Sequence, residues 1–451
     1  MTSNNGVAIF ENFPTNWELT ALGEVCKRGG GFVQTGPFGS QLHASDYVEN
    51  GVPTVMPVNI SENKILIDGI ARISEENAEK LSRHRLAPGD IVFSRRGDVT
   101  RRALIREEQR GWLCGTGCLK IHLGKDIVDP LFASLYFGHP DVKDWIIRHA
   151  VGSTMPNLNG KIMESIPFLL PPLPEQRAIA RILGALDDRI ELNRRMNHTL
   201  EEMARALFKS WFVDFDPVTA KAEGRVPFGM NVETASLFSA EFEETSNEDF
   251  PEIPKGWNLQ NLDDIADYEN GLALQKFPPE GDDFLPVIKI RELRQGFADE
   301  SSNRASPNIK ASCILDDGDV VFSWSGSLMI DLWCGGKGAL NQHLFKVTSE
   351  KYPKWFYYYW TEYHLPDFQD IAEGKATTMG HIQRHHLTSA KVVVPSDDVL
   401  VRANKAIAPL LDSIIKNRVQ NKTLITIRDS LLPKLMSGEV SVRNGALGGV
   451  A

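Results

Sequence analysis

The sequence lacks the features of a secreted or membrane-bound protein. No run approaches the ~20 consecutive apolar residues that a membrane span requires. The first residues, MTSNNGVAIFENFP, have no basic start followed by an apolar segment. Five cysteines in 451 residues are too few and too scattered for a disulfide framework. We therefore expect a soluble, cytoplasmic protein that does not contact a membrane.

Metal-binding and cofactor-binding motifs are also scarce. Cys114, Cys118 and His122 are spaced four residues apart, but no fourth ligand follows at a usual distance. Buried thiols are the favoured interpretation, and no metal site is expected. The sequence also contains no Walker A loop and no Asn-Pro-Pro-Tyr/Phe methyltransferase box.

Negative charge is concentrated in one stretch of the chain. The formal charge is −10, and the stretch from Asp214 to Lys255 holds ten acidic and three basic residues. The rest of the chain therefore carries only −3 (−10 + 7). In contrast, eight arginines lie between Arg83 and Arg110. A nearly neutral body with a basic cluster can bind a phosphate backbone, especially in a complex that adds positive charge.

Two copies of one pattern make up most of the chain. NRRMNHTL at 193–200 and NRVQNKTL at 417–424 share five residues at the same offsets, 224 positions apart (417 − 193). LAPGDIVFSRRGD at 86–98 corresponds to LDDGDVVFSWSGS at 315–327. In each copy, Gly-Asp followed by a Val/Ile-rich run predicts a turn, a strand and then a polar loop. A pattern repeated over this length predicts a repeated structural unit.

Each copy ends in a long segment with apolar residues spaced alternately 3 and 4 apart. This spacing predicts two helices with heptad seams, one from Ile179 to Trp211 and one from Ala403 to Leu435. The centres of the seams are asparagines: Asn193 and Asn197 in the first, Asn417 and Asn421 in the second. Antiparallel pairing would place Asn193 opposite Asn421 and Asn197 opposite Asn417. Buried asparagines fix the register of a coiled coil at a cost in stability.

One pair in this register matches poorly, because Leu186 would face Arg428; we expect Arg428 to extend along its aliphatic stem towards solvent. The alternative is that the two helices are unrelated and each packs on its own domain. The coincidence of both asparagine pairs favours the coiled coil, with the two globular parts at opposite ends.

The expected fold is α+β: two globular mixed α/β domains separated by two long helices that form an antiparallel coiled coil, with a pseudo-two-fold internal repeat. The expected segments are a first globular domain at 1–173, a helix at 174–213, an acidic linker at 214–250, a second globular domain at 251–396, a second helix at 397–438 and a flexible tail at 439–451. The acidic linker is expected to form a loose surface excursion.

Two similar heads at a fixed separation suit a regular polymer such as duplex DNA. Arg, Lys, Asn and Gln contact base edges, and Ser, Thr and Arg also contact phosphates. In the first copy the candidates for DNA contact are Arg95, Arg96, Arg101, Arg102, Thr154, Asn157 and Asn159. In the second copy they are Lys289, Arg291, Trp324, Ser325, Gln342, His343, Thr377, Thr378, His381, Gln383 and Arg384. Because the copies differ most in these loops, we expect a bipartite, asymmetric target.

The order of these segments resembles the specificity subunit of type I restriction–modification systems, over essentially the whole chain. The resemblance is carried by LPEQRAIARILGALDDRIELN at 173–193, LFKSWFVDFDP at 207–217, GDVVFSWSGS at 318–327 and NQHLFKV at 341–347. It implies a non-catalytic subunit with two target-recognition domains and two conserved-region helices. These helices dock two methyltransferase subunits and, through them, restriction/translocase subunits. S-adenosylmethionine, ATP and Mg are then cofactors of the partners and not of this chain. The second helix lacks the LPEQ and SWFVDF sequences, so the two docking sites are expected to differ in strength.

Two rival functions remain open. Pro366-Asp367 followed by Glu373 and Lys375 matches the Mg-binding pattern of restriction nucleases, but five residues between Asp and Glu are few for a hairpin that would bring them together. The second rival is a coiled-coil scaffold whose two heads bind proteins and not DNA. A binding assay at increasing salt separates this rival from a DNA-binding protein.

Overall fold

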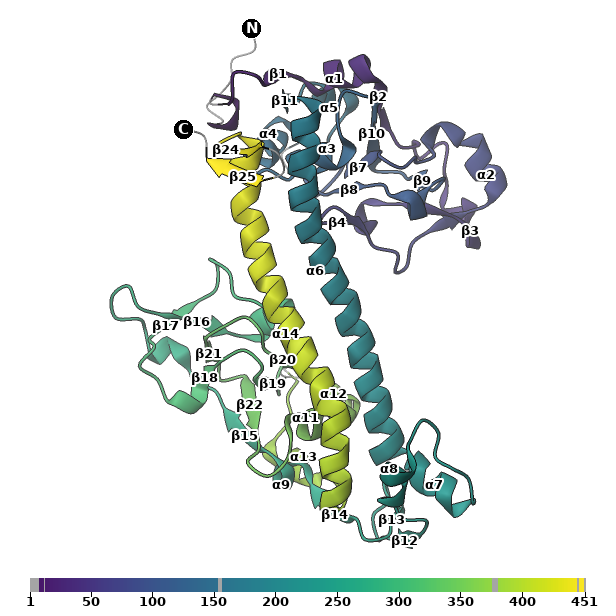
Figure 1. The fold of residues 1–451 in the computed structure, drawn as a ribbon, viewed down its shortest axis with the longest axis vertical. Coiled ribbons are helices and arrows are strands. Elements are labelled where there is room, and N and C mark those ends of the chain that lie inside the picture. The colour runs from purple at the N-terminus through teal and green to yellow at the C-terminus, as the bar shows by residue number, and fades with distance from the viewer. Residues whose placement is uncertain (1–7, 12, 153–155, 375–379, 444–445, 450–451) are drawn as a thin grey trace. The chain divides into compact units, whose positions relative to one another are not determined.

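A computed structural model describes residues 8–11, 13–152, 156–374, 380–443 and 446–449. The chain divides into two compact units: Met1–Arg189 with Leu424–Ala451, and Ile190–Thr423. Each unit contains one globular head, called head one and head two below (Figure 1). Two long helices, α6 (Leu173–Phe208) and α14 (Asp397–Met436), each contribute residues to both units.

Head one is built from short strands and short helices. Its strands are β1 (Glu18–Ala21), β2 (Gly30–Thr35), β3 (Tyr47–Val55), β4 (Ile60–Ser61), β5 (Lys64–Ile65), β6 (Arg72–Ile73), β7 (Ile91–Ser94), β8 (Arg102–Leu104), β9 (Leu113–Cys114), β10 (Cys118–Gly124) and β11 (Pro167–Leu170). Its α-helices are α1 (Leu22–Gly29), α2 (Glu75–Lys80), α3 (Pro130–Tyr136), α4 (Pro140–His149) and α5 (Gly160–Glu164). A hairpin of β24 (Val440–Arg443) and β25 (Ala446–Gly449) belongs to the same unit.

Head two repeats much of this set. Its strands are β14 (Asn258–Asn261), β15 (Asp267–Asn270), β16 (Leu285–Ile288), β17 (Arg304–Ala305), β18 (Ile314–Leu315), β19 (Val320–Ser323), β20 (Met329–Leu332), β21 (Gly338–Leu340), β22 (Leu344–Thr348) and β23 (Lys391–Val394). Its α-helices are α9 (Leu262–Ile265), α10 (Ile290–Gln295), α11 (Lys354–Tyr363), α12 (Leu365–Glu373) and α13 (Arg384–Ser389).

The sheets of the two heads have the same order. A four-stranded antiparallel sheet runs β2-β10-β7-β8 in head one and β15-β22-β19-β20 in head two. A smaller sheet in each head contains one parallel pair, β3 with β9 and β16 with β21. A two-stranded sheet, β1-β11 or β14-β23, joins the first and last strands of each head. The predicted α+β fold with an internal repeat is therefore confirmed.

The Gly-Asp dipeptides that mark the repeat form the turn before the central strands β7 and β19. Gly89 and Gly318 both have φ of +90°, in the left-handed region that a residue without a Cβ enters readily. The carboxylate of Asp90 accepts a hydrogen bond from the backbone N–H of Ala87 at 2.9 Å, and Asp319 closes its own turn in the same way. The four residues of each following strand are buried, as the Val/Ile-rich runs predict.

In the unit of head two, α6 and α14 run antiparallel (Figure 1). Asn193 donates through Nδ2 to Asn421 Oδ1 at 2.9 Å, and Asn421 donates to the carbonyl of Ile190 at 3.3 Å. The repeat-related bonds run from Asn417 to Asn197 at 2.9 Å and from Asn197 to the carbonyl of Ile414 at 3.2 Å. Each of these two bonds of the first pair thus has a counterpart in the second pair, shifted by 224 residues, and all four asparagines are buried.

In the unit of head one, the start of α6 packs against the end of α14. Ile179 and Leu183 share a hydrophobic core with Leu435 and Met436. Arg428 does not extend to solvent as expected, because its guanidinium pairs with Asp187 at 3.0 Å. A carboxylate one residue from the mismatched Leu186 therefore compensates the arginine.

The segment 214–250 is not the loose excursion that its acidic composition predicts. It contains α7 (Asp216–Ala222), α8 (Val232–Ser236) and β12 (Phe242–Glu244), which pairs with β13 (Glu252–Pro254). Phe215, Phe238 and Phe250 are buried in the core of head two, and this apolar burial orders the segment. The expected flexible tail differs too, since β24 and β25 form a hairpin and Val440 and Val442 pack on the core of head one.

Candidate nucleic-acid interface

A tight loop follows strand β7 in head one. Ser94 donates through Oγ to the carbonyl of Arg96 at 2.7 Å, and Gly97 allows the turn with φ of +74°. The loop is tied to a second loop, because the N–H of Leu158 donates to the carbonyl of Arg95 at 2.9 Å. Arg95 and Asn157 thereby become neighbours, and the Nε of Arg95 donates to Asn157 Oδ1 at 3.2 Å.

Head two contains the same construction after strand β19. Ser323 donates through Oγ to the carbonyl of Ser325 at 3.2 Å, and Gly326 has φ of +73°. The N–H of Ile382 donates to the carbonyl of Trp324 at 3.0 Å. Antiparallel bridges connect Arg96 with Asn157 in head one and Ser325 with His381 in head two. The equivalent pairs are therefore Arg95 and Trp324, Arg96 and Ser325, and Asn157 and His381.

The four candidate arginines of head one differ in availability. Arg96 is exposed and makes no side-chain hydrogen bond or ion pair within the described part of the chain. Arg101 is exposed and pairs with Asp98 at 3.2 Å, and Arg95 is half-buried. Arg102 is only 8% exposed and donates to the carbonyl of Ser134.

Arg102 is therefore a structural residue, which corrects its assignment as a DNA contact. Burial lowers the pKa of its guanidinium to about 10, while Asp187 and Glu62 act in the opposite direction. It remains protonated at neutral pH and joins the central sheet to α3.

The other candidates of head one come from the loop before α5. Asn157 is half-buried, and its backbone pairs with Val151 through two hydrogen bonds of 3.0 and 2.9 Å. Asn159 is the N-cap of α5, accepting from the N–H of Ile162 at 2.9 Å, so its amide oxygen has a structural task. Thr154 lies outside the described residues.

In head two, aromatic and imidazole rings surround the equivalent loop. The ring of Trp324 lies 6.1 Å from that of His343 and 6.4 Å from that of His381, and its Nε1 donates to Asn270 Oδ1 at 3.1 Å. Ser325 Oγ is 2.9 Å from His343 Nδ1, and Gln342 Nε2 is 3.3 Å from His343 Nε2. The structure thus brings five predicted candidates together in one polar, aromatic cluster: Trp324, Ser325, Gln342, His343 and His381.

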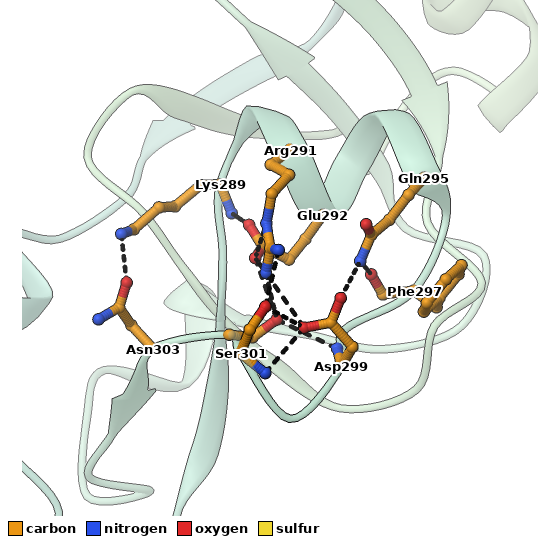
Figure 2. A network of polar contacts seen from close by, with 9 residues as sticks. Lys289, Arg291, Glu292, Gln295, Phe297, Asp299, Ser301 and Asn303 are labelled. Carbon is orange, nitrogen blue, oxygen red and sulfur yellow. Dashed lines mark hydrogen bonds and ion pairs between the residues drawn. The ribbon is translucent and has the colours of Figure 1, made fainter. Parts of the chain in front are cut away.

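Lys289 and Arg291 belong to a separate network around the loop 296–303 (Figure 2). Glu292 is buried and accepts hydrogen bonds from Arg291 Nη2 at 2.7 Å and Ser302 Oγ at 3.0 Å. Arg291 also pairs with Asp299 at 3.2 Å. Lys289 Nζ is held by Asn303 Oδ1 at 2.5 Å.

This network changes the role of Arg291, whose guanidinium neutralises a buried carboxylate. Burial of Glu292 opposes ionisation, but its hydrogen bonds with Arg291, Ser302 and backbone N–H groups outweigh burial and lower its pKa. Arg291 is half-exposed, so its outer edge still faces solvent. Its first function is to hold the loop 296–303.

The last candidates lie on or before α13. Gln383 and Arg384 are both exposed. Arg384 donates to the carbonyl of Tyr268 at 3.0 Å, and its guanidinium lies 5.5 Å from the ring centre of Phe345. Thr377 and Thr378 fall outside the described residues.

Two neighbours of these loops were missing from the sequence-based candidates. Phe38 is 54% exposed, and the guanidinium of Arg95 lies 5.9 Å from its ring centre. Asn270 accepts the hydrogen bond of Trp324. An aromatic residue in the turn sequence Gly-Pro-Phe-Gly at 36–39 was an available signal for Phe38. The role of Asn270, in contrast, depends on a side-chain hydrogen bond to a residue 54 positions away.

The two carboxylates of the nuclease pattern do not converge. Asp367 and Glu373 lie near the two ends of one helix, α12, roughly 9 Å apart along its axis. Lys375 is not among the described residues. Across the described ranges, no three His, Cys, Asp or Glu side chains converge where they could hold a metal ion. Cys114 and Cys118 are buried thiols, and burial raises the pKa of Cys114 to about 12.

Comparisons with known proteins agree with this architecture. The family model described as "Type I restriction modification DNA specificity domain" matches residues 14–202 and 254–428. The chain is 25% identical to the HindI specificity subunit of Haemophilus influenzae, over 87% of this chain and 95% of that protein. It is 23% identical to the MjaIX specificity subunit of Methanocaldococcus jannaschii, over 95% of this chain and 94% of the relative.

A solved structure has the same fold. The type I restriction–modification S subunit from M. genitalium aligns with a TM-score of 0.57 at 15% identity, covering 94% of this chain and 96% of that chain. Because the family model matches both halves, the chain belongs to the type I restriction–modification DNA specificity family. None of the described helices offers an apolar stretch sufficient to span a bilayer.

Proposed function

We propose that the chain is the DNA-recognition subunit of a cytoplasmic type I restriction–modification complex and that each head recognises one part of a bipartite, asymmetric site. It is a recognition subunit and not an enzyme, as its family membership indicates. The observation that supports two different half-sites is the pair of equivalent loops. On the same backbone frame, one head carries Arg95-Arg96 and the other carries Trp324-Ser325.

Docking of two methyltransferase subunits is the second part of the proposal. On α6, Leu192, Met196 and Met203 are 48%, 42% and 49% exposed. Their spacing of four and seven residues places them on one helix face, next to the asparagine seam. An exposed apolar stripe of this kind suits an amphipathic helix of a partner.

The chemistry then belongs to the partners. Methyltransferase subunits supply adenine methylation with S-adenosylmethionine, and restriction/translocase subunits attached through them use ATP and Mg. This chain contributes the choice of sequence.

The direct test is to sequence methylated adenines in the host with and without this chain. A bipartite motif should disappear when the chain is deleted. Exchange of residues 95–98 for the sequence of 324–327 should change one half of the motif only. If the same motif persists without the chain, the chain does not choose the target.

A binding assay separates this function from a protein-binding scaffold. The complex of the chain with methyltransferase subunits should lose DNA affinity steeply as salt rises, because bound phosphates release counterions. The chain without partners should bind DNA weakly, given its charge of −10. Salt-independent binding would favour the scaffold.

A further inference from the structure

The loop between α7 and α8, taken together with the first residue of α8 (residues 224–232), presents apolar side chains to solvent. Phe228 is 104% exposed, Val232 82% and Val226 76%. A fully exposed phenylalanine forfeits burial worth about 1.5–3 kcal/mol. Three such side chains within seven residues indicate a contact surface rather than scattered surface residues.

This loop is held in place from within. Pro227, between Val226 and Phe228, is buried, and Met230 packs against the core of head two. The side chain of Asn231 caps α8 by accepting from the N–H of Thr234 at 2.8 Å. Arg402 of α14 donates through Nε to Thr234 Oγ1 at 2.6 Å. The apolar tip is therefore presented in an ordered conformation, which lowers the entropic cost of binding.

The stretch that contains the loop, residues 214–255, is acidic, and its three basic residues are already engaged. Arg225 pairs with Glu223, and Lys255 pairs with Glu241. Lys221 donates to the carbonyls of Ala235 and Phe238. The exposed side chains of Glu244 and Glu248 make no hydrogen bond or ion pair among the described residues. Lys209 and Arg402, from outside this stretch, pair with Asp214 and Glu233. A net charge of −5 (−7 + 2) therefore remains for an incoming cationic surface.

This charge selects the class of partner. A DNA backbone is repelled by the exposed carboxylates. A second copy of the chain would bring the same negative charge against this one. A protein surface with lysines and arginines around an apolar pocket matches both features, since interfaces combine a buried aromatic anchor with a polar rim.

We infer that Phe228 and Val226 are an anchor for a basic-rimmed apolar pocket on the methyltransferase subunit. The inference rests on the proposed function. It adds a second contact, distinct from the stripe on α6, and this contact lies in the acidic segment that follows the first long helix.

The test measures binding of the host's methyltransferase subunit to the full chain by titration calorimetry. Val226→Ser with Phe228→Ser should weaken binding at least tenfold, while thermal unfolding of the chain stays unchanged because both side chains face solvent. The matched control is Val58→Ser with Phe297→Ser, which removes exposed apolar residues of head one and head two. The control should keep the wild-type affinity.

A second variant tests the charge. Glu244→Lys with Glu248→Lys should weaken binding and reduce its salt dependence. Unchanged affinity in both variants would overturn the anchor and leave the proposed function intact if methylation continues. Loss of self-association in the anchor variant, seen by sedimentation, would overturn it in favour of a second copy. If the wild-type chain itself fails to bind the methyltransferase subunit, it is the proposed function that fails.

Discussion

In head one the residue after the central strand is Arg95, whose guanidinium is shared between Asn157 and the ring of Phe38. In head two the equivalent residue is Trp324, whose indole N–H is bound by Asn270. Both loops are closed by a serine hydroxyl, a left-handed glycine and backbone hydrogen bonding to a distant loop. These are bonds of backbone and small residues, so the exposed side chains are free to differ.

The difference teaches where sequence recognition can change without a change of fold. An exposed arginine such as Arg96 can bind guanine or a phosphate by hydrogen bonds alone. A cluster of Trp324, Ser325 and His343 offers stacking surface together with a donor and an acceptor. Under the proposed function, we therefore expect recognition by head one to depend more on charge, and recognition by head two to depend more on shape and neutral hydrogen bonds.

A second comparison lies beneath these loops, at the Gly-Asp turns. The side chain of Asp90 is 1% exposed, with His122 Nδ1 at 2.7 Å and Lys120 Nζ at 3.9 Å. In head two, Asp319 is 23% exposed, and Lys346 Nζ lies 2.7 Å away. The equivalent Asp–Lys pairs thus differ in burial. Asp90 with Lys120 is buried in head one, whereas Asp319 with Lys346 is partly hydrated in head two.

The largest expected effect follows from this difference. Asp90→Ala leaves the buried Lys120 without its carboxylate and should cost about 3–5 kcal/mol. Asp319→Ala should cost less, about 1–3 kcal/mol, because water reaches Lys346. Hydrogen exchange followed by mass spectrometry measures the loss of protection in β10 and in β22 separately. Equal losses of protection in the two heads would contradict the difference in burial.

The next effect concerns the asparagines at which the two copies meet. Asn193→Leu and Asn417→Leu are equivalent under the repeat, and each leaves one buried amide, on Asn421 or Asn197, without its partner. Each should cost about 1–3 kcal/mol in urea unfolding. Thr199→Leu, on the exposed side of α6, is the control and should be nearly neutral.

Asn193 also donates to Gln420 Oε1 at 2.9 Å, so its substitution should be slightly the more costly of the two. A large cost for only one of the variants would contradict the symmetric seam. Cysteines placed at 193 and 421 should cross-link in the folded chain.

Much of this architecture could be predicted from the sequence, because it is local or repeated. The heptad spacing and the shift of 224 placed each asparagine opposite its partner, and the Gly-Asp dipeptides located the central strands. Both signals depend only on intervals along the chain. The segment 214–250 was misjudged because Phe215, Phe238 and Phe250 have no periodic spacing and find their core on distant helices.

The candidate site was harder to predict than the fold. Arg102 and Arg96 lie in one short arginine-rich stretch, yet one is buried against α3 and the other is exposed. Which arginine faces inwards depends on the packing of α3, more than 30 residues away. Arg291 was a candidate by residue type, whereas its partner Glu292 becomes buried only when the loop 296–303 folds over it. Residue type identifies candidates for DNA contact, and tertiary packing decides which of them remain available.

A smaller effect is expected for the exposed arginine. Arg96→Ala should weaken binding of the partner-loaded complex about tenfold to duplexes that carry the first half-site and reduce the salt dependence. Scrambling the first half-site should weaken binding of the variant less than binding of the wild-type complex, because one contact is already lost. Arg102→Ala is the contrasting variant and should lower stability. Equal loss at both half-sites would contradict recognition of one half-site by each head.

The smallest effect is confined to acid pH and distinguishes the heads by one residue. Glu292 in head two and Asn59 in head one take the same place, each accepting from the backbone N–H three residues before it, at 3.1 and 3.0 Å. The pKa of Glu292 is lowered in the folded state, so its stabilising contribution is complete above the unfolded value of about 4.3. That contribution is lost as the pH falls through the lowered pKa, because protonation breaks the bond with Arg291. Asn59 does not titrate.

The loop 296–303 of head two should therefore lose protection from hydrogen exchange as the pH falls below about 4.3. The η3 turn (Pro57–Asn59) of head one should not lose protection through residue 59. The Glu292→Gln variant should have a lower free energy of unfolding than the wild-type chain at neutral pH. It should lose less of that free energy on acidification. Pulsed hydrogen exchange across this range measures both loops in one sample. If the variant keeps the acid sensitivity of the wild-type chain, another carboxylate such as Asp299 holds the loop, and the contrast between Glu292 and Asn59 has no effect on stability.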